Sequence, residues 1–415
     1  MTRASEPTEF RFVGAGDVYK RGRLAGHLTR EHASVRFEYD LAYLADSAAP
    51  AVATTLPRTE QPARSGAAGA VPPFFAGLLP EGRRLSALQR AVKTSADDEL
   101  TLLLAVGADT IGDVQVVPAG APLPADPVAI EVHDWSAVRF GQVFADVTGE
   151  RLVPQRAGVA GVQVKVSARM ITLPVARAHE RYILKLDPPE FPHLVANEAF
   201  FLEAARQSGL AVAHAEVVRD ADGETGLLVR RFDRTADSGG TTTMLAQEDA
   251  CQVLGRYPAD KYSIATEDVI RGLAGVTQAP VVAARDLVRQ FAFTYLICNG
   301  DAHAKNFSVL RLPDGEWRVT PAYDLPSSYL YGDSTLALPI AGKLDERVGR
   351  ADFVALGDEV GVPPRATGRV LDSLLERLDT WLPGIDELPF DDRILRKFRR
   401  AVEYRRDRLA PRSVR

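Results

Sequence analysis

The feature that most constrains the fold of this chain is a group of polar residues that flank one short hairpin, within residues 291–324. An apolar run ends at Asn299, and a strand–turn–strand pattern with a Pro-Asp-Gly turn at 313–315 follows. The return strand leads almost directly into Asp324. Because a hairpin brings its two open ends together, the residues from Asp301 to Asn306 are expected to lie close to Asp324.

The spacing of these residues favours phosphoryl transfer. Asp301 is followed five residues later by Asn306, as in the catalytic loop of protein kinases, where the aspartate positions the attacking hydroxyl and the asparagine holds a metal ion. Asp324 lies where a kinase has its second metal-binding aspartate, and Mg²⁺ prefers such oxygen ligands. On spacing alone, Asn-Gly-Asp and Tyr-Asp-Leu-Pro could equally be ordinary turns.

Longer motifs resemble one known family. GDAHAKNFSVL at 300–310 and TPAYDLPSS at 320–328 resemble the signature of the HipA-type serine/threonine kinases, the toxin halves of bacterial toxin–antitoxin pairs. QEDACQVLGRYPADKY at 247–262 and LLVRRFDR at 227–234 also resemble segments of that family. The resemblance implies an α+β, two-lobed protein-kinase-like fold, with a mixed α/β N-terminal part, an added N-terminal subdomain and a mainly helical C-lobe.

The domain organisation follows from length and from this resemblance. A chain of 415 residues suits two domains or one two-lobed enzyme. We expect an N-terminal subdomain at 8–120, an N-lobe with a phosphate loop and an ATP lysine at 128–235, and a helical C-lobe at 236–412. In the first part, strands are predicted at Phe12-Val13, Val18-Tyr19 and 35–39, with a turn at 20–23. Residues 47–73 are predicted to form a long loop, in part disordered.

A glycine-bearing run at 156–165 feeds a predicted strand. Glycines let backbone N–H groups approach phosphate oxygens closely, although the pattern alone indicates an ordinary hairpin more than a phosphate loop. In the family, a serine in this loop is the autophosphorylation site; Gly158 occupies that position here, and Ser167 on the following strand is not expected to replace it. The resemblance implies nucleotide contacts at Ala160, Gly161, Val162, Gln163, Val164 and Lys165.

Lys185 lies in a strand-like run at 181–186, facing away from the apolar side chains of that run. A lysine in an apolar strand is unfavourable unless its charge is paired, and kinases pair a strand lysine with a helix glutamate. The candidate partner is Glu198, in a helix predicted at 196–208 that Gly209 would end. A lysine that extends into solvent is the alternative, but the match of YILKLD to the family's nucleotide-binding lysine favours the paired role.

Several further site residues rest on the resemblance. The strand-like run 226–232 falls at the hinge between kinase lobes, which implies nucleotide contacts through the backbone of Arg230, Arg231 and Phe232, with arginine side chains that could simply be solvated. His303 is expected to support the loop or to contact the nucleotide rather than to act as a base. Tyr323 and Asp324 are expected to contact the nucleotide. Lys305 is expected to stabilise the transferring phosphoryl group as a nearby cation.

Composition gives few further constraints. The net charge of −5 gives no global reason to expect binding to nucleic acid or membranes. The isolated cysteines Cys251 and Cys298, with a polar N-terminus, favour a reducing cytoplasm over secretion. A basic run at 393–408 is interpreted as the solvated face of a helix whose buried stripe is Ile394, Phe398 and Val402; a nucleic-acid-binding strip is the alternative.

The function that the resemblance implies is transfer of a phosphoryl group from ATP, with Mg²⁺ held by Asn306 and Asp324 and with Asp301 orienting the hydroxyl of a protein substrate. Characterised targets in the family include an aminoacyl-tRNA synthetase such as glutamyl-tRNA synthetase, whose phosphorylation stalls translation and growth. The implied partner is a HipB-like helix-turn-helix antitoxin, with DNA reached only through that complex. Two rival functions remain: a small-molecule kinase on the same scaffold, and a non-catalytic ATP-binding partner of a repressor.

Overall fold

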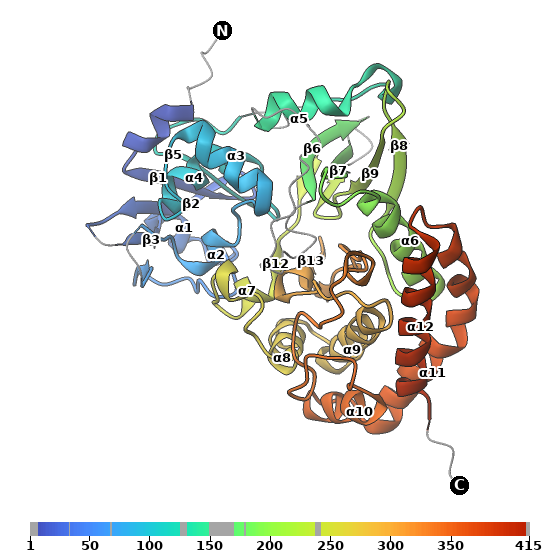
Figure 1. Ribbon diagram of the computed structural model, residues 1–415. Coiled ribbons are helices and arrows are strands. Elements are labelled where there is room, and N and C mark those ends of the chain that lie inside the picture. The colour runs from blue at the N-terminus through green and yellow to red at the C-terminus, as the bar shows by residue number, and fades with distance from the viewer. Residues whose placement is uncertain are drawn as a thin grey trace.

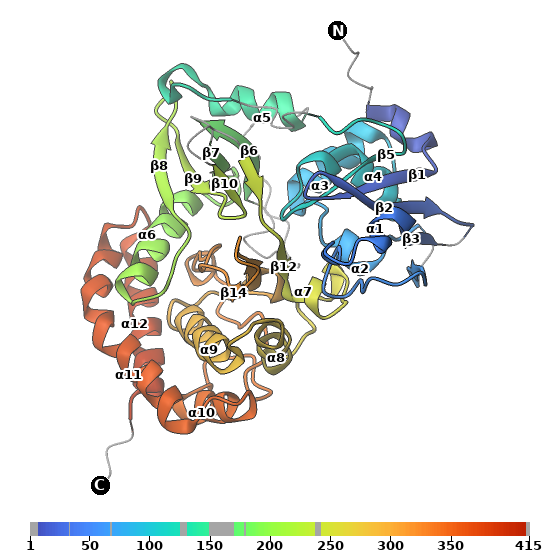
Figure 2. The ribbon, with the colours of Figure 1, turned by 180° about the vertical axis from the view of Figure 1, so that it is seen from behind.

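The computed structural model describes residues 7–32, 34–66, 69–124, 131–148, 170–177, 180–236 and 242–411. We refer to the described residues up to 124 as the N-terminal module, to 131–236 as the N-lobe and to 242–411 as the C-lobe. In both views of the ribbon the N-terminal module lies beside the two lobes, and helices α11 (Pro364–Trp381) and α12 (Asp392–Leu409) lie on the opposite side of the molecule (Figures 1 and 2). The candidate site residues lie where the three parts meet.

The N-terminal module is an antiparallel sheet, with strand order β4-β3-β2-β1-β5, whose buried side packs against short helices. Strands β1 and β2 are joined through Arg21 and Gly22, which both have positive φ, so the predicted turn at 20–23 is confirmed. The elements are β1 (Ala15–Lys20), β2 (Arg23–Arg30), β3 (Val35–Tyr39), α1 (Leu41–Ala45), β4 (Ala63–Arg64), α2 (Pro73–Ala76), α3 (Gly82–Val92), α4 (Glu99–Val106) and β5 (Val114–Pro118).

Two expectations for this module need correction. The pair Phe12-Val13 is not a strand, because a 3₁₀ helix occupies Pro7–Phe12 and leaves the Phe12 side chain exposed. The segment 47–73 is largely irregular, as predicted, but some of its apolar residues are packed into the core: Val52 and Leu56 are buried. Apolar anchors therefore fix this loop against the module's core.

The N-lobe sheet has the antiparallel order β6-β7-β9-β8. Alternate residues of β7 face opposite sides, so Tyr182 and Leu184 pack with Phe140 of α5, while Lys185 faces the other side. Helix α6 begins two residues earlier than predicted, and Gly209 follows it with φ of +80°. The strand predicted after the glycine-bearing run lies outside the described residues. The elements are α5 (Phe140–Thr148), β6 (Ile171–Arg177), β7 (Glu180–Leu186), α6 (Leu194–Gln207), β8 (Ala215–Arg219) and β9 (Thr225–Arg230).

The C-lobe is mainly helical and is built around α9, in which every residue from Phe291 to Leu296 is buried. A small sheet of β12, β13 and β14 carries the predicted hairpin, with Gly315 at a positive φ in its turn. Strand β10 (Arg234–Ala236), at the end of the N-lobe, pairs with β11 (Thr242–Met244) of the C-lobe. The other C-lobe elements are β12 (Gln247–Asp249), α7 (Ala250–Val253), α8 (Thr266–Val276), α9 (Pro280–Leu296), β13 (Ser308–Arg311), β14 (Trp317–Val319), α10 (Arg350–Glu359), α11 (Pro364–Trp381) and α12 (Asp392–Leu409).

The apolar spacing of residues 247–254 predicts a helix, but the first turn of this segment is not helical. Gln247 pairs with Leu310 of β13, so the segment starts as strand β12. The side chain of Asp249 then accepts a hydrogen bond from the backbone N–H of Gln252 and caps the short helix α7. A long-range strand pairing therefore overrides a local helical pattern.

The C-terminal helix α12 buries a different stripe from the one predicted. Leu395, Phe398 and Val402 are buried, while Ile394 is exposed. Arg405, which was expected on the solvated face, is buried and donates hydrogen bonds to the carbonyl oxygens of Tyr295 and Ser334 at 2.6 and 2.9 Å. Most other basic side chains of this helix are exposed, which confirms the solvated face: Arg393, Arg396, Lys397, Arg400 and Arg408.

None of the described helices combines the length and the apolar character needed to cross a membrane.

Candidate active site

The loop that follows α9 holds Asp301 in a fixed position. Asp301 is buried, its Oδ1 accepts a 2.5 Å hydrogen bond from the hydroxyl of Tyr262, and its backbone N–H donates to Oδ1 of Asn299 at 2.9 Å. The N–H of Gly300 donates to Oγ of Ser328 at 2.7 Å. A Cβ at position 300 would lie 2.7 Å from a backbone oxygen, so the loop needs glycine there.

Asn306 and Asp324 meet at the open end of the hairpin, as predicted. Nδ2 of Asn306 donates to Oδ2 of Asp324 at 2.5 Å, and Oδ1 of Asn306 accepts from the backbone N–H of His303 at 3.0 Å. Asp324 has a φ of +57°, a left-handed conformation that is unfavourable for a non-glycine residue and persists only where surrounding contacts hold it. We infer that Asp324 keeps this strained backbone conformation because it places the carboxylate beside Asn306.

Lys185 of the N-lobe contacts the carboxylate of Asp324 in the C-lobe and so links the two lobes. Its Nζ lies 2.6 and 2.9 Å from the two carboxylate oxygens of Glu198 and 3.0 Å from Oδ1 of Asp324. Burial alone would lower the pKa of Lys185, but the two carboxylates raise it above its usual value, so its ammonium stays charged. The predicted pairing with Glu198 is confirmed, and the lysine does not extend into solvent.

The pKa values of Glu198 and Asp324 are shifted in opposite directions. Burial raises the pKa of Glu198 to about 7. Burial would also raise the pKa of Asp324, but the neighbouring ammonium of Lys185 holds it below its usual value. Asp324 is therefore ionised at neutral pH.

The residues at the hairpin end fit Mg²⁺. Asp324 offers a carboxylate and Asn306 an amide oxygen, which are the hard ligands that Mg²⁺ takes alongside phosphate oxygens and water. The Asn306 amide turns its NH₂ toward Asp324 here, so a shared cation requires rotation of that amide. No cluster of three or more histidine, cysteine or acidic residues suited to a metal occurs in the described parts of the chain.

A cavity of about 250 Å³ lies beside this group, and all three parts of the chain contribute to its walls. Pro174, Ile183 and Val229 form an apolar wall from the N-lobe, and Tyr323 contributes an aromatic ring from the C-lobe. Apolar walls with a few directed polar groups are typical of small-ligand sites. The predicted residues that line it are Lys185, Arg230, Arg231, Phe232, Lys305 and Tyr323.

The hinge arginines differ from each other. Arg230 is exposed and pairs with Glu180 at 2.6 Å. Arg231 is not solvated: it is 5% exposed, and it pairs with Asp233 and with Asp109 of the N-terminal module, each at 2.8 Å. The suggestion that both arginine side chains are solvated is therefore wrong for Arg231, because an acid far away in the sequence lies against it.

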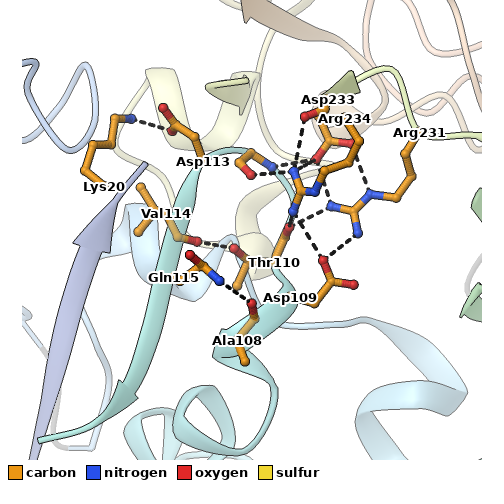
Figure 3. Close-up of polar contacts among 11 residues, drawn as sticks. Lys20, Ala108, Asp109, Thr110, Asp113, Val114, Gln115, Arg231, Asp233 and Arg234 are labelled. Atoms are coloured by element: carbon orange, nitrogen blue, oxygen red, sulfur yellow. Dashed lines mark hydrogen bonds and ion pairs between the residues drawn. The ribbon is translucent and has the colours of Figure 1, made fainter. Parts of the chain in front are cut away.

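Arg231 belongs to a buried network that joins the hinge to the N-terminal module (Figure 3). The carboxylate of Asp233 accepts hydrogen bonds from Arg231, from Arg234 and from the backbone N–H of Gly112 at 2.7–3.0 Å. The carbonyl oxygen of Thr110 accepts from both arginines at 2.7 Å. The segment that follows α4 is thus tied directly to the strand end beside the cavity.

His303 is buried, and Lys305 and Tyr323 are partly buried. The Nζ of Lys305 lies 3.0 Å from Oε1 of Glu81 and donates to the carbonyl oxygen of Gly77 at 3.2 Å. The hydroxyl of Tyr323 donates to the carbonyl oxygen of Lys305 at 2.8 Å. The His303 ring lies edge to face with Tyr262, with centroids 5.1 Å apart.

Sequence reasoning missed three contributors: Tyr262, Glu81 and Asp249. Tyr262 closes the family-like segment 247–262, so its position in a motif was the available signal. Asp249 lies in the same family-like segment, so the same signal was available for it. Glu81 carries no local signal of its partner Lys305, which is far away in the sequence. The phosphate-loop residues Ala160, Gly161, Val162, Gln163, Val164 and Lys165 lie outside the described residues, as do Gly158 and Ser167.

His303 predicts a measurable pH dependence of stability. Burial, with repulsion from Lys261, lowers the pKa of His303 to about 4. An unfolded chain takes up this proton near pH 6.5, whereas the folded chain does not until about pH 4, so acidification across this window favours unfolding, by up to about 3 kcal/mol for this group.

Urea unfolding of the wild type and of His303→Gln at pH 7, 6 and 5 isolates this contribution. Glu198 and Asp249, with pKa values of about 7 and 6, act in the opposite direction in both proteins and cancel in the comparison. The wild type should lose more stability than His303→Gln as the pH falls. Parallel profiles would show that His303 does not stay neutral.

Comparison with known proteins identifies the family. The HipA N-terminal domain model matches residues 16–117, and the HipA-like C-terminal domain model matches residues 157–382. The candidate kinase Y4mE of Sinorhizobium fredii is 31% identical over 93% of this chain and 96% of its own length. The serine/threonine-protein kinase toxin HipA of Shewanella oneidensis is 28% identical over 78% of this chain and 80% of its own length.

A solved structure shares the fold. HipA of Shewanella oneidensis MR-1, in a complex with HipB and its operator DNA, matches with a TM-score of 0.77 and 22% identity over 95% of this chain and 97% of that one. This likeness confirms the predicted kinase-like fold of mixed helices and sheets. Together with the named relatives, it confirms the kinase class of enzyme, and the chain belongs to the HipA family.

Proposed function

We propose that this chain transfers the γ-phosphoryl group of ATP to a serine or threonine hydroxyl of a bacterial protein. The observation that supports it most is that Lys185 of the N-lobe and Asn306 of the C-lobe bind the two oxygens of one carboxylate, that of Asp324. A charged lysine, an amide and an ionised acid in one buried place suit a triphosphate and its cation.

Each residue has a role in this proposal. Lys185, oriented by Glu198, binds phosphate oxygens, and Asn306 and Asp324 hold Mg²⁺. Asp301 orients the attacking hydroxyl and accepts its proton, while Lys305 adds positive charge nearby. Bound Mg²⁺ supplies the charge that neutralises the transferring group. The backbone of Arg230, Arg231 and Phe232 receives the base, with His303 and Tyr323 beside the nucleotide and the loop residues 160–165 over its phosphates.

The finer assignments are also proposals. The subdomains extend over 8–120, 128–235 and 236–412, and the enzyme acts in the cytoplasm, where Cys251 and Cys298, both buried and free, stay reduced. The partner is a HipB-like antitoxin, supported by the HipA–HipB complex named above, and DNA is reached through that partner. The substrate class to test first is the aminoacyl-tRNA synthetases, with glutamyl-tRNA synthetase as the first member, whose phosphorylation would inhibit translation and growth.

The test is transfer of labelled γ-phosphate from Mg·ATP to a bacterial extract separated into proteins and small metabolites. A labelled protein band, identified by mass spectrometry, would support the proposal and give the target. Label in the metabolite fraction alone would indicate a small-molecule kinase. Binding of ATP without transfer to either fraction would indicate a non-catalytic partner of a repressor.

A further inference from the structure

The N-terminal module places a short segment, residues 77–81, at the active site. This segment joins α2 to α3, and both views show α2 beside α7 of the C-lobe (Figures 1 and 2). Leu78, Leu79 and Pro80 line the cavity, and the carbonyl oxygen of Gly77 accepts a hydrogen bond from Lys305. The N-terminal module therefore forms one wall of the site.

Glu81 at the end of this segment bridges two lysines of the C-lobe. Its Oε2 lies 2.5 Å from Nζ of Lys261, and its Oε1 lies 3.0 Å from Nζ of Lys305. The lysine side chains are only 13% and 12% exposed. Two ammonium groups this far from water need a nearby anion, and Asp249, 3.8 Å from Lys305, reaches only one of them.

Both lysines are coupled to the loop that carries Asp301. The carbonyl oxygen of Lys261 accepts a hydrogen bond from the N–H of Ala304 at 3.1 Å, and the next residue, Tyr262, donates to Asp301. Lys305 lies within the same loop. Glu81 therefore contacts the loop's cation and the segment that orients its aspartate at the same time.

The Glu81 side chain is an anion in this setting. Burial would raise its pKa, but the ammonium groups of Lys305 and Lys261 hold the pKa of Glu81 well below its usual range. The alternative is a salt bridge that only docks the module, and Arg83 in the first turn of α3 supplies an example, because it pairs with Glu190 of the N-lobe and with neither lysine. That pair supplies a matched control.

We propose that Glu81 is a positioning residue of the kinase site: it holds Lys261 and Lys305 beside Asp301, so that the N-terminal module completes the phosphoryl-transfer machinery. This inference rests on the proposed function. Glu81 acts through the lysines and does not contact the reacting atoms. The N-terminal module is then part of the catalytic unit, in addition to any role in partner binding.

The experiment compares Glu81→Gln, Glu81→Asp and the control Glu190→Gln in the full chain, after circular dichroism confirms folding. Two readouts are used: kcat and KM for ATP, and the labelling of Lys261 and Lys305 by an amine-reactive reagent at one fixed pH, followed by mass spectrometry. Glu81→Gln should lower kcat about 10- to 100-fold, as misplacement of catalytic groups does, with little change in the KM for ATP, because Lys185 and the hinge are untouched.

The same variant should label several-fold faster at both lysines, and Glu190→Gln should match the wild type in both readouts. Glu81→Asp keeps the charge but has one methylene group fewer, so its kcat and its lysine labelling should lie between those of the wild type and Glu81→Gln. If Glu81→Gln does not fold, the comparison of Glu81→Asp with the wild type is the test. Unchanged kcat or unchanged labelling in Glu81→Gln would overturn the inference. If the wild type transfers no phosphate, the proposed function fails, and labelling alone decides whether Glu81 holds the lysines.

Discussion

Replacement of Asp301 by asparagine is expected to lower kcat by about 10²- to 10⁴-fold, the usual contribution of a positioned general base, without unfolding the protein. Asparagine keeps the size of the side chain and an oxygen that can accept the hydrogen bond now donated by Tyr262. It loses the capacity to take a proton. Steady-state transfer of labelled phosphate measures kcat, and thermal unfolding shows that the fold is retained.

Asp314→Asn is the matched control for this experiment. Asp314 lies in the exposed turn of the same hairpin, where its carboxylate accepts a hydrogen bond from the backbone N–H of Glu316, so the same chemical change there should leave kcat unaltered. If Asp301→Asn transfers phosphate at the wild-type rate, Asp301 is not the residue that orients the hydroxyl.

Replacement of Asp233 by alanine is expected to lower the free energy of unfolding by about 3–5 kcal/mol, as loss of one partner from a buried charge network does. Asp233 is buried between Arg231 and Arg234. Without it, Asp109 is the one carboxylate that still pairs with the two guanidinium groups among the residues that the structure describes, and Gly112 loses its acceptor. Urea unfolding monitored by circular dichroism measures the change.

Arg230→Ala serves as the comparison at the neighbouring position. The side chains of Arg230 and of its partner Glu180 are 46% and 35% exposed, and pairs this open to water contribute at most about 1 kcal/mol. A small loss for Arg230→Ala beside a large loss for Asp233→Ala would show that burial decides the effect. Equal losses would mean that the network shown in Figure 3 contributes no more to stability than a surface pair.

The parts of the site that sequence could predict are those fixed by local geometry. A hairpin with a Pro-Asp-Gly turn necessarily brings its ends together, which placed Asn306 next to Asp324 in advance. Strand alternation put Lys185 on the face opposite its apolar neighbours, and its need for a partner indicated Glu198. In these cases the local geometry of a hairpin or strand decides where a side chain points. The pairing of Lys185 with Glu198 then follows from the need to neutralise a buried charge.

The parts that sequence could not predict depend on contacts between the N-terminal module and the lobes. Arg231 has no local sign of burial, because its partner Asp109 is supplied by the N-terminal module. The environment of Glu81 could not be predicted either, because nothing near it in the sequence indicates that it pairs with Lys261 and Lys305. On α12, the register of the buried face depends on what α9 and the loop before α10 offer, so Arg405 points inward and Ile394 outward.

The measurement that tests the central claim most directly is phosphoamino-acid analysis of protein labelled by the purified chain with γ-labelled Mg·ATP. The account predicts phosphoserine or phosphothreonine in a substrate protein, with label lost when EDTA removes the metal and when Asp324 is replaced by asparagine. Label confined to small molecules, or label that persists without metal and without Asp324, would contradict the assignment of this site to serine or threonine phosphorylation.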